Sequence, residues 1–161
     1  MKNAFSFLLV LCLIILNSCV PNYNYRVEPP TDWTMYDTVM QGLKVRILKA
    51  PKSLAADNPI VNIIIKSMGN SDIDNFTIDN MDYLKSNMGS VVLLEKGNID
   101  ISTINARWFT YTKEHNGIIR EMINYIIPVK GSAYMITCGT NKGSMSKYRL
   151  TFDKIAQSFK E

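Results

Sequence analysis

The sequence predicts an α+β domain in which an antiparallel sheet is covered by helices on both faces. Residues 104–138 contain three strand patterns joined by short turns, which indicates an antiparallel meander. Residues 60–66 and 118–127 direct apolar side chains to both sides, and strands of this kind need cover on both faces. The chain ends in an amphipathic helix pattern with a stripe of four apolar residues, Tyr148, Phe152, Ile155 and Phe159.

The first half of the domain begins with two predicted strands. Residues 23–28 alternate apolar and polar side chains, as a half-buried strand does, and a Pro-Pro turn and Trp33 follow. Residues 43–50 predict a second strand, and Pro51 ends it because proline has no amide hydrogen for a sheet. A third strand is expected at residues 60–66.

A helix is expected after the polar loop 69–75. Asn75 or Thr77 is the expected N-cap, and Gly89 is the expected stop at the C-terminus. The expected buried stripe consists of apolar residues at helical spacing, Ile78, Met81, Leu84 and Met88.

The second half predicts the remaining strands and the last helix. The Asn116-Gly117 pair is a strong hairpin signal, and Gly131-Ser132 predicts a further turn. Ser144 is the expected N-cap of the last helix. The strands are expected at residues 90–94, 104–112, 118–127 and 133–138.

The N-terminus predicts export and lipid anchoring. Residues 1–18 combine a basic start with an apolar run that is shorter than the roughly 20 residues needed to span a bilayer, which is typical of a signal peptide. Leu16 and Ser18 precede Cys19 as they do in a bacterial lipoprotein signal. The Cys19 sulfur would then carry diacylglycerol, and its amine a fatty acyl chain such as palmitate. An ordinary signal peptide, which would leave Cys19 as a free thiol, is the alternative.

The predicted anchor also bears on location. Residues 19–22 form a tether that spans at most about 14 Å, so we expect the domain of residues 23–161 to lie close to the membrane. Val20, rather than aspartate, follows Cys19, and this favours the periplasmic side of the outer membrane over the inner membrane.

Composition excludes several classes of function. The net charge of +4 falls to +3 when Lys2 leaves with the signal peptide, and no Lys/Arg cluster with interleaved aromatics predicts a nucleic-acid partner. Cys12 leaves as well, so Cys138 is the one cysteine available to the domain and no internal disulfide is expected.

The sequence contains residues of types that often take part in catalysis or metal binding, but their positions do not predict a catalytic or metal site. His115 lies in a hairpin tip, where we expect it to be solvated, and Cys138 ends an apolar strand, where we expect a buried, inert thiol. Two further patterns depart from the ligand-binding motifs that they resemble. The residues Asp72, Asp74, Asn75 and Asp79 do not have the spacing of a calcium loop, and residues 139–144 lack the ending of a phosphate loop. We therefore expect no catalytic residues, metal or cofactor.

Several aromatic residues could form either core or a binding surface, namely Trp33, Tyr36, Trp108, Phe109 and Tyr111. Core is the favoured interpretation. Trp108 and Phe109 are adjacent in a strand and must point to opposite faces, so each should meet a different helical layer unless one face is partly open.

The chain resembles the PsbP-like family over nearly all of residues 23–161. The resemblance rests on the stretches Pro-Pro-Thr-Asp-Trp33, Ala50-Pro51, Asn58-Pro59-Ile60-Val61-Asn62-Ile63, Ala106-Arg107-Trp108, Ala133-Tyr134-Met135-Ile136-Thr137 and the final Phe152–Lys160 helix. It implies an α-β-α sandwich with a mostly antiparallel sheet of about six or seven strands.

The resemblance also implies that the domain binds another protein rather than catalysing a reaction. The leading hypothesis is a membrane-anchored, non-enzymatic lipoprotein of the cell envelope that binds a partner protein through an edge or face of its sheet. The alternative is capture of a small apolar or lipid-like ligand near the membrane, in a cavity lined by Trp108 or Tyr111. Hydrolysis at a site assembled from distant residues ranks last.

Overall fold

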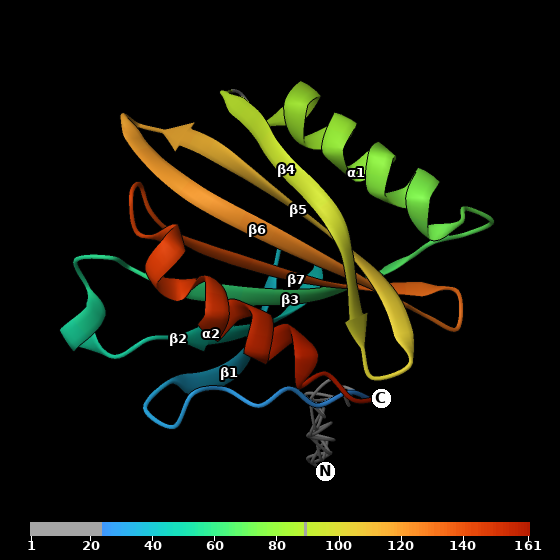
Figure 1. Ribbon diagram of the computed structural model, residues 1–161, viewed down its shortest axis with the longest axis horizontal. Helices are drawn as coiled ribbons and strands as arrows, with labels where there is room; N and C mark the ends of the chain where they lie inside the picture. Colours follow the sequence, from blue (N-terminus) through green and yellow to red (C-terminus); the bar gives the residue numbers. More distant parts are fainter. Residues whose placement is uncertain (1–23, 89) are drawn as a thin grey trace, which may run out of the picture.

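The computed structural model describes residues 24–88 and 90–161, which form one antiparallel sheet and two α-helices (Figure 1). The predicted signal peptide, tether and Cys19 lie outside the described residues, as does Gly89. The elements are β1 Thr34–Met40, β2 Leu43–Lys49, a 3-10 turn Lys52–Leu54, β3 Ile60–Ser67, α1 Ile73–Asn87, β4 Val91–Ile101, β5 Ile104–His115, β6 Ile118–Val129, β7 Ser132–Asn141 and α2 Met145–Gln157.

The seven described strands are ordered β1-β2-β3-β7-β6-β5-β4, so β1 and β4 form the two edges of the sheet. Two-residue turns connect the hairpins β1–β2, β5–β6 and β6–β7. Their central residues, Gln41-Gly42, Asn116-Gly117 and Lys130-Gly131, all have positive φ angles. This is the geometry whose twist matches that of the flanking strands. The expected meander is therefore confirmed.

The two helices cover opposite faces of the sheet. On β7, Tyr134, Ile136 and Cys138 pack in the same cluster as α2, whereas Ala133 and Met135 pack in the cluster that contains α1 residues. Successive strand residues point to opposite faces, so the two clusters lie on either side of the sheet. The predicted α-β-α arrangement is confirmed, and we call the two sides the α1 face and the α2 face.

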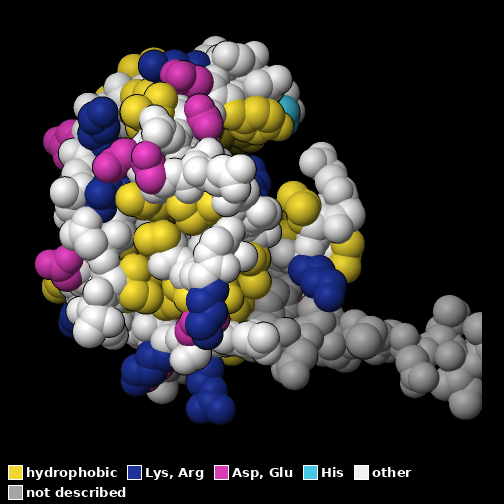
Figure 2. Space-filling model, turned by 90° about the vertical axis from the view of Figure 1, so that its right-hand side faces the viewer, with side chains coloured by type: hydrophobic (Ala, Val, Ile, Leu, Met, Phe, Trp, Pro, Cys, Tyr) yellow, Lys and Arg dark blue, Asp and Glu magenta, His cyan; other side chains and the backbone are white. Residues whose placement is uncertain are grey.

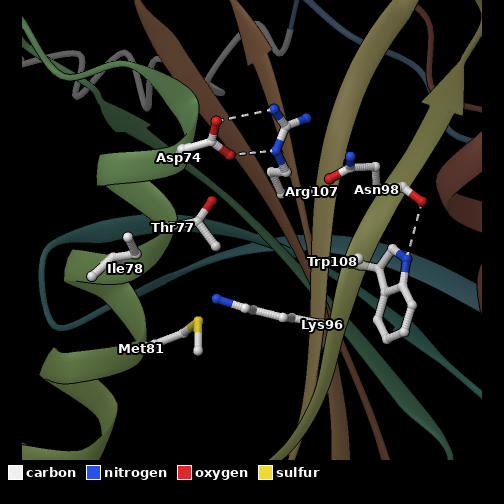
Figure 3. Close-up of a pocket in the computed structure, with 9 residues that line it drawn as sticks. Asp74, Thr77, Ile78, Met81, Lys96, Asn98, Arg107 and Trp108 are labelled. Atoms are coloured by element: carbon white, nitrogen blue, oxygen red, sulfur yellow. Dashed lines mark hydrogen bonds and ion pairs between the residues drawn. The ribbon is translucent and has the colours of Figure 1, made fainter.

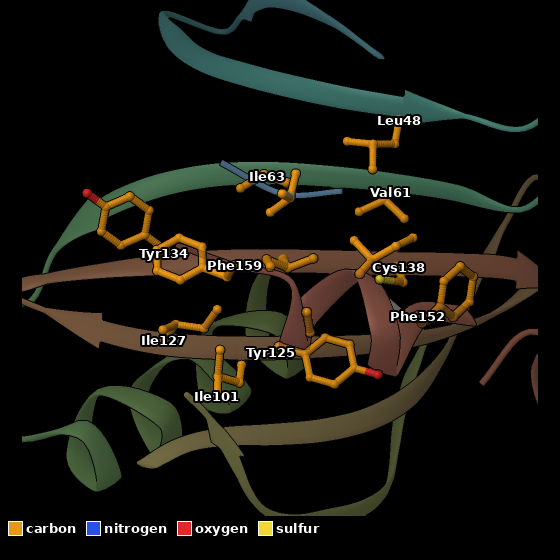
Figure 4. Packing of buried hydrophobic residues seen from close by; sticks show 14 of the residues in the cluster. Leu48, Val61, Ile63, Ile101, Tyr125, Ile127, Tyr134, Cys138, Phe152 and Phe159 are labelled. Atoms are coloured by element: carbon orange, nitrogen blue, oxygen red, sulfur yellow. The ribbon is translucent and has the colours of Figure 1, made fainter. Parts of the chain in front are cut away.

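The α2 face contains the larger core. All four predicted stripe residues of the last helix are buried there, and Phe152 and Ile155 are at most 1% exposed. Figure 4 shows Phe152 and Phe159 beside strand residues such as Tyr134 and Cys138. Burial of such side chains supplies most of the free energy that holds a domain of this size together.

Residues 23–28 do not form the predicted strand in the described part of the chain. Tyr25 and Val27 are buried as their alternation predicts, but Arg26 makes a single antiparallel bridge with Lys160 near the C-terminus. The two backbone hydrogen bonds, of 2.7 and 3.0 Å, tie the two ends of the domain together. The alternation of apolar and polar residues therefore predicted which side chains are buried. It did not predict that residues 23–28 have no partner strand to pair with in the described part of the chain.

The edge strand β1 was missed, and the later strands are longer than predicted. Gln41-Gly42 was a usable turn signal, because it separates two stretches of strand-forming residues. On the other side of the sheet, β4 extends to Ile101 beyond a register shift between Leu93 and Lys96, which breaks its alternation. β6 continues through Pro128, which pairs with Ala133 next to the turn.

Helix α1 starts earlier than predicted, and of its predicted stripe Met81, Leu84 and Met88 pack on the sheet whereas Ile78 does not. Its N-cap is Asp72, whose Oδ1 accepts a 2.8 Å hydrogen bond from the Asn75 amide. Phe76 and Leu84 are buried, whereas Ile78 is 47% exposed. Ile78 follows Phe76 by two residues, which places it about 200° further around the helix, so the two cannot share one face. The bulky Phe76 decides which side faces the sheet.

The start of α2 is fixed by the carboxylate of Asp57. Its Oδ1 accepts a hydrogen bond from Ser144 at 2.8 Å, and its Oδ2 accepts one from Tyr148 at 2.9 Å and forms an ion pair with Lys147. The predicted N-cap Ser144 does precede α2, but its hydroxyl donates to Asp57. The Lys147 hydrogen bond, followed by those of Ser144 and Tyr148, lowers the pKa of Asp57 from 3.8 to about 2.

We expect Asp57 to make the domain sensitive to acid. Because its pKa is lower in the folded chain, its stabilisation is complete above the unfolded pKa and is lost as pH falls from about 4 toward about 2. In Asp57→Asn this part of the pH dependence should disappear, as measured by urea denaturation at a series of pH values. Asp32→Asn is the control, and an unchanged pH profile in Asp57→Asn would contradict this role.

Candidate functional site

His115 and Cys138 lie in surroundings that do not favour catalysis. His115 is exposed at the end of β5, beside the hairpin turn. Cys138 is fully buried in the α2-face core, and burial raises the pKa of its thiol well above the ordinary value. A thiol without access to solvent or to a base does not form the thiolate that nucleophilic catalysis needs.

The acidic residues around the start of α1 are used in local structure. Asp72 caps the helix and also accepts a hydrogen bond from the Asn75 side chain, while Asp74 pairs with Arg107. Across the described residues, no group of three or more His, Cys, Asp or Glu side chains could hold a metal ion. Residues 139–144 comprise the end of β7 and the turn into α2.

The aromatic pair in β5 does divide between the faces. Phe109 is fully buried in the α1-face cluster, together with Tyr111. Trp108 lies on the α2 face, where the Arg149 guanidinium is 4.4 Å from the ring centre. Trp33 is buried in the same core, whereas Tyr36 on β1 is 47% exposed. The predicted distribution of Trp108 and Phe109 is therefore confirmed.

A cleft between α1 and the strands β4 and β5 is the candidate binding site (Figure 3). It has a volume of about 340 Å³, within the size range of small-molecule sites. The helix contributes Asp74, Thr77, Ile78 and Met81, and the strands contribute Lys96, Gly97, Asn98, Arg107 and Trp108. The cleft thus combines an apolar wall on the helix with charged groups on the strands.

An ion pair between α1 and β5 closes one end of the cleft. The Arg107 guanidinium donates to both oxygens of Asp74, at 2.6 and 3.3 Å. The same guanidinium also donates to the Asn105 side chain. The hydrogen bond from Arg107 lowers the pKa of Asp74 and raises that of Arg107. The pair fixes the first turn of α1 over the sheet, so the cleft wall is held in a defined position.

Lys96 supplies a positive charge to the cleft. Its side chain extends from β4 toward the helix, between Thr77 and Met81 (Figure 3). Among the described residues its ammonium group has no hydrogen bond or ion pair, but its charge contributes to the lowered pKa of the Asp74 carboxyl. Because Asp74 balances Arg107, the cleft has a net charge of +1 and suits an acidic or electron-rich group next to an apolar one.

Gly97 allows Trp108 to lie flat across the neighbouring strand. A Cβ atom at position 97 would be 2.9 Å from Trp108 Cζ2. The indole nitrogen donates to the Asn98 carbonyl at 3.2 Å. Trp108 is thereby held between Gly97 and Arg149 on the α2 face, and its indole lies on the side of the strands away from α1 (Figure 3).

We expect Gly97→Ala to displace the Trp108 indole and to lower the free energy of unfolding by about 1–3 kcal/mol, as overpacking usually does. Urea denaturation would measure the change. In a Trp108→Leu background, Gly97→Ala should lower the free energy of unfolding by much less, since the clash with the indole is removed. Equal costs in the two backgrounds would show that the close contact with the indole is not the cause.

The chemical makeup of this cleft could not be read from the sequence. Asp74 and Arg107 are 33 positions apart, and no spacing rule connects a helix residue to a strand residue at that distance. Lys96 follows a register shift in β4, and the shift decides which face its side chain takes. The position of Trp108 in a strand does not indicate its contact with Arg149 on α2.

The chain matches a family model described as PsbP-like protein over residues 21–161. A search of curated proteins found no match. In the part of the chain that the structure describes, neither helix has the length and apolar character needed to cross a bilayer.

Several solved structures share the fold at low sequence identity. PA94 from Pseudomonas aeruginosa, a protein of unknown function, has a TM-score of 0.65 and 15% identity, covering 78% of this chain and 94% of that one. The cyanobacterial PsbP of Synechocystis has a TM-score of 0.63 and 14% identity, covering 84% and 85%. LpqN of Mycobacterium tuberculosis, involved in cell envelope biogenesis, has a TM-score of 0.61 and 13% identity, covering 84% and 81%.

Proposed function

The chain belongs to the PsbP-like protein family, and from this premise we propose that it is a membrane-anchored, non-catalytic lipoprotein of the cell envelope that binds a partner protein. The lipidation signal at Cys19 and the similarity to the envelope protein LpqN support the location. Within the envelope we favour the periplasmic side of the outer membrane. The thiol of Cys138 and the imidazole of His115 both lie away from the cleft, which supports binding rather than catalysis.

The observation that carries this proposal is the position of the cleft at an open edge of the sheet. β4 is an edge strand, so its outer backbone groups can pair with an added strand. Val92 and Leu94 on β4 are each 58% exposed, and Ile78 at the cleft is 47% exposed. An extended segment of a partner could lie along β4 and place an acidic and an apolar side chain in the cleft.

Site-specific photo-crosslinking of the full-length protein in its own cells tests this surface. A photoreactive amino acid at position 78 should yield one defined crosslinked envelope protein. The same amino acid at position 150 should not, since Leu150 lies on α2 although it is more accessible than Ile78, at 65% against 47% exposed. The second variant therefore controls for random contacts.

Charge reversal sharpens the same experiment. Lys96→Glu should reduce the crosslink from position 78 by about tenfold or more, because it places a like charge against the acidic group of the partner. Lys142→Glu, on an exposed residue between β7 and α2, should leave the crosslink unchanged. An undiminished crosslink in Lys96→Glu, or equal crosslinks from positions 78 and 150, would exclude the cleft as the binding surface.

A second candidate function is capture of a small ligand in the cleft, because an apolar helix wall faces Lys96 there; Trp108 is among the lining residues, but its indole lies on the α2 face. Ile78 and Met81 would contact the apolar part, and Lys96 would favour an acidic head group. Mass spectrometry of the native purified protein should then detect a bound small molecule that Met81→Asp loses. If mass spectrometry finds no bound molecule on the parent protein, and position 78 crosslinks to an envelope protein, the cleft binds a partner protein rather than a small ligand.

A further inference from the structure

We propose that the tip of the β1–β2 hairpin, residues 39–44, inserts into the lipid bilayer as a second membrane contact beside Cys19. This inference rests on the proposed function, since it takes Cys19 as the anchored residue. Three features of the described chain support it: apolar exposure on both sides of the hairpin, projection of the hairpin from the sheet, and contact of its base with the start of the domain.

The hairpin tip exposes large apolar side chains on both of its sides. Val39, Met40 and Leu43 are 62%, 53% and 45% exposed. Met40 and Leu43 are cross-strand partners on one side, and Val39 pairs with Lys44 on the other. A flat protein surface could cover only one of these sides. A bilayer surrounds an inserted tip on all sides, so exposed apolar side chains on both sides of the hairpin fit a bilayer better than a flat protein surface.

The tip projects beyond the rest of the sheet. β2 pairs with β3 only from Arg46 to Lys49, so residues 43–45 pair with β1 alone. β1 and β2 pass behind the sheet in Figure 1, and Figure 2 shows on that side a lobe with hydrophobic and basic side chains that stands apart from the body. A two-stranded ribbon of this kind can enter an interface without disturbing the core.

The base of the hairpin lies beside the start of the described chain. The Arg46 guanidinium donates to the Tyr25 carbonyl at 3.4 Å and is 4.9 Å from the centre of its ring. From Tyr25 back to Cys19 the chain spans at most about 21 Å. Leu43 is three strand residues, or about 10 Å, from Arg46. An anchor at Cys19 therefore holds the tip within reach of the bilayer surface.

The charges of the hairpin favour an anionic bilayer. Lys44 and Lys49 are exposed, and the one acidic residue of β1 and β2, Asp37, is paired with Arg46 at 2.8 Å. Lys44 thus lies at the apolar tip beside Val39, and Lys49 lies at the base of the hairpin, where it pairs with Thr34. Each basic residue near such a surface contributes electrostatic attraction to anionic lipid, in addition to the burial of apolar side chains.

The test uses the mature chain, residues 19–161, with Cys19→Ala so that no lipid is attached. A cysteine introduced at Val39 is labelled with an environment-sensitive dye, and Leu150→Cys is the matched exposed control. Cys138 is fully buried and does not react. With protein-free vesicles of phosphatidylglycerol and phosphatidylethanolamine, the dye at position 39 should shift to the blue, and the dye at position 150 should not.

The triple variant Val39→Asp, Met40→Asp, Leu43→Asp should bind these vesicles at least about tenfold more weakly than the parent chain. The double variant Ile118→Asp, Leu150→Asp, which changes exposed apolar residues elsewhere, should bind as the parent does. Equal vesicle binding by the triple variant would overturn the proposal. A blue shift of the dye at position 39 that appears only when envelope proteins are added would also overturn it, because the tip would then bind a protein partner. A blue shift that grows with protein concentration in the absence of vesicles would assign the tip to contact with a second copy of the chain.

The outcome is independent of the anchor. The tested chain lacks the Cys19 thiol, so a negative result removes the hairpin contact and leaves the proposed lipidation untouched. Conversely, if native Cys19 is unmodified, insertion of the tip into vesicles can still be measured.

Discussion

Cys19→Ala should move the protein from the membrane fraction to the soluble fraction. A single acyl chain holds a protein to a bilayer only marginally, at about 0.8 kcal/mol per buried methylene, and stable anchoring needs two or more chains. The diacylglycerol thioether and the acylated amine proposed for Cys19 would supply them. The hairpin tip would leave a weak, reversible affinity, so release should be nearly complete on washing.

The variant needs a leader that is removed without lipidation, since residues 1–18 could otherwise stay attached and hold the chain to the membrane. Replacing them with a general secretory signal peptide meets this need. Cys12→Ala in the natural leader is the matched control, because Cys12 is expected to leave with the signal peptide. Membrane retention of the Cys19→Ala chain to the same extent as Cys12→Ala would contradict the anchor.

Phe152→Ala should lower the free energy of unfolding by about 3–5 kcal/mol, the usual cost of removing a fully buried phenylalanine. Phe152 is 0% exposed in the α2-face core (Figure 4). The centre of its ring lies 6.1 Å from that of Tyr148. A domain of this size has a total stability of only about 5–15 kcal/mol. Urea denaturation of the mature chain with Cys19→Ala would measure the loss.

Leu150→Ala provides the control on the same helix. Leu150 is 65% exposed, so its removal leaves no cavity and should change stability by at most about 0.5 kcal/mol. A loss of less than about 1 kcal/mol for Phe152→Ala would mean that α2 does not hold the domain together through this face.

The sequence predicted the parts of the fold whose signals are local. The stripe from Tyr148 to Phe159 and the Asn116-Gly117 turn each carry their geometry in nearby residues. The turn was confirmed, and all four stripe residues are buried, although α2 ends at Gln157 and Phe159 follows it. Residues 23–28 alternate correctly, but whether a strand forms depends on a partner, and there the partner is one residue, Lys160. Pairing between distant segments is a tertiary property that alternation alone does not encode.

The candidate cleft shows the same limit more strongly. Ile78 was expected in the core, yet it borders the cleft because Phe76 takes the sheet-facing position. The Asp74–Arg107 pair joins a helix to a strand, and only the packing of α1 on the sheet brings the two residues together. The family resemblance gave the layers of the fold correctly, but it gave no residues for the site.

The intact mass of the mature protein, purified from membranes of its own cells, tests the account most directly. We predict a chain that begins at Cys19, with residues 1–18 removed and with the added mass of diacylglycerol and an acyl chain on that residue. Cys19→Ala should lose this added mass. A mature chain that begins elsewhere, or that carries an unmodified Cys19, would contradict the anchored location on which the proposed partner and the second membrane contact both depend.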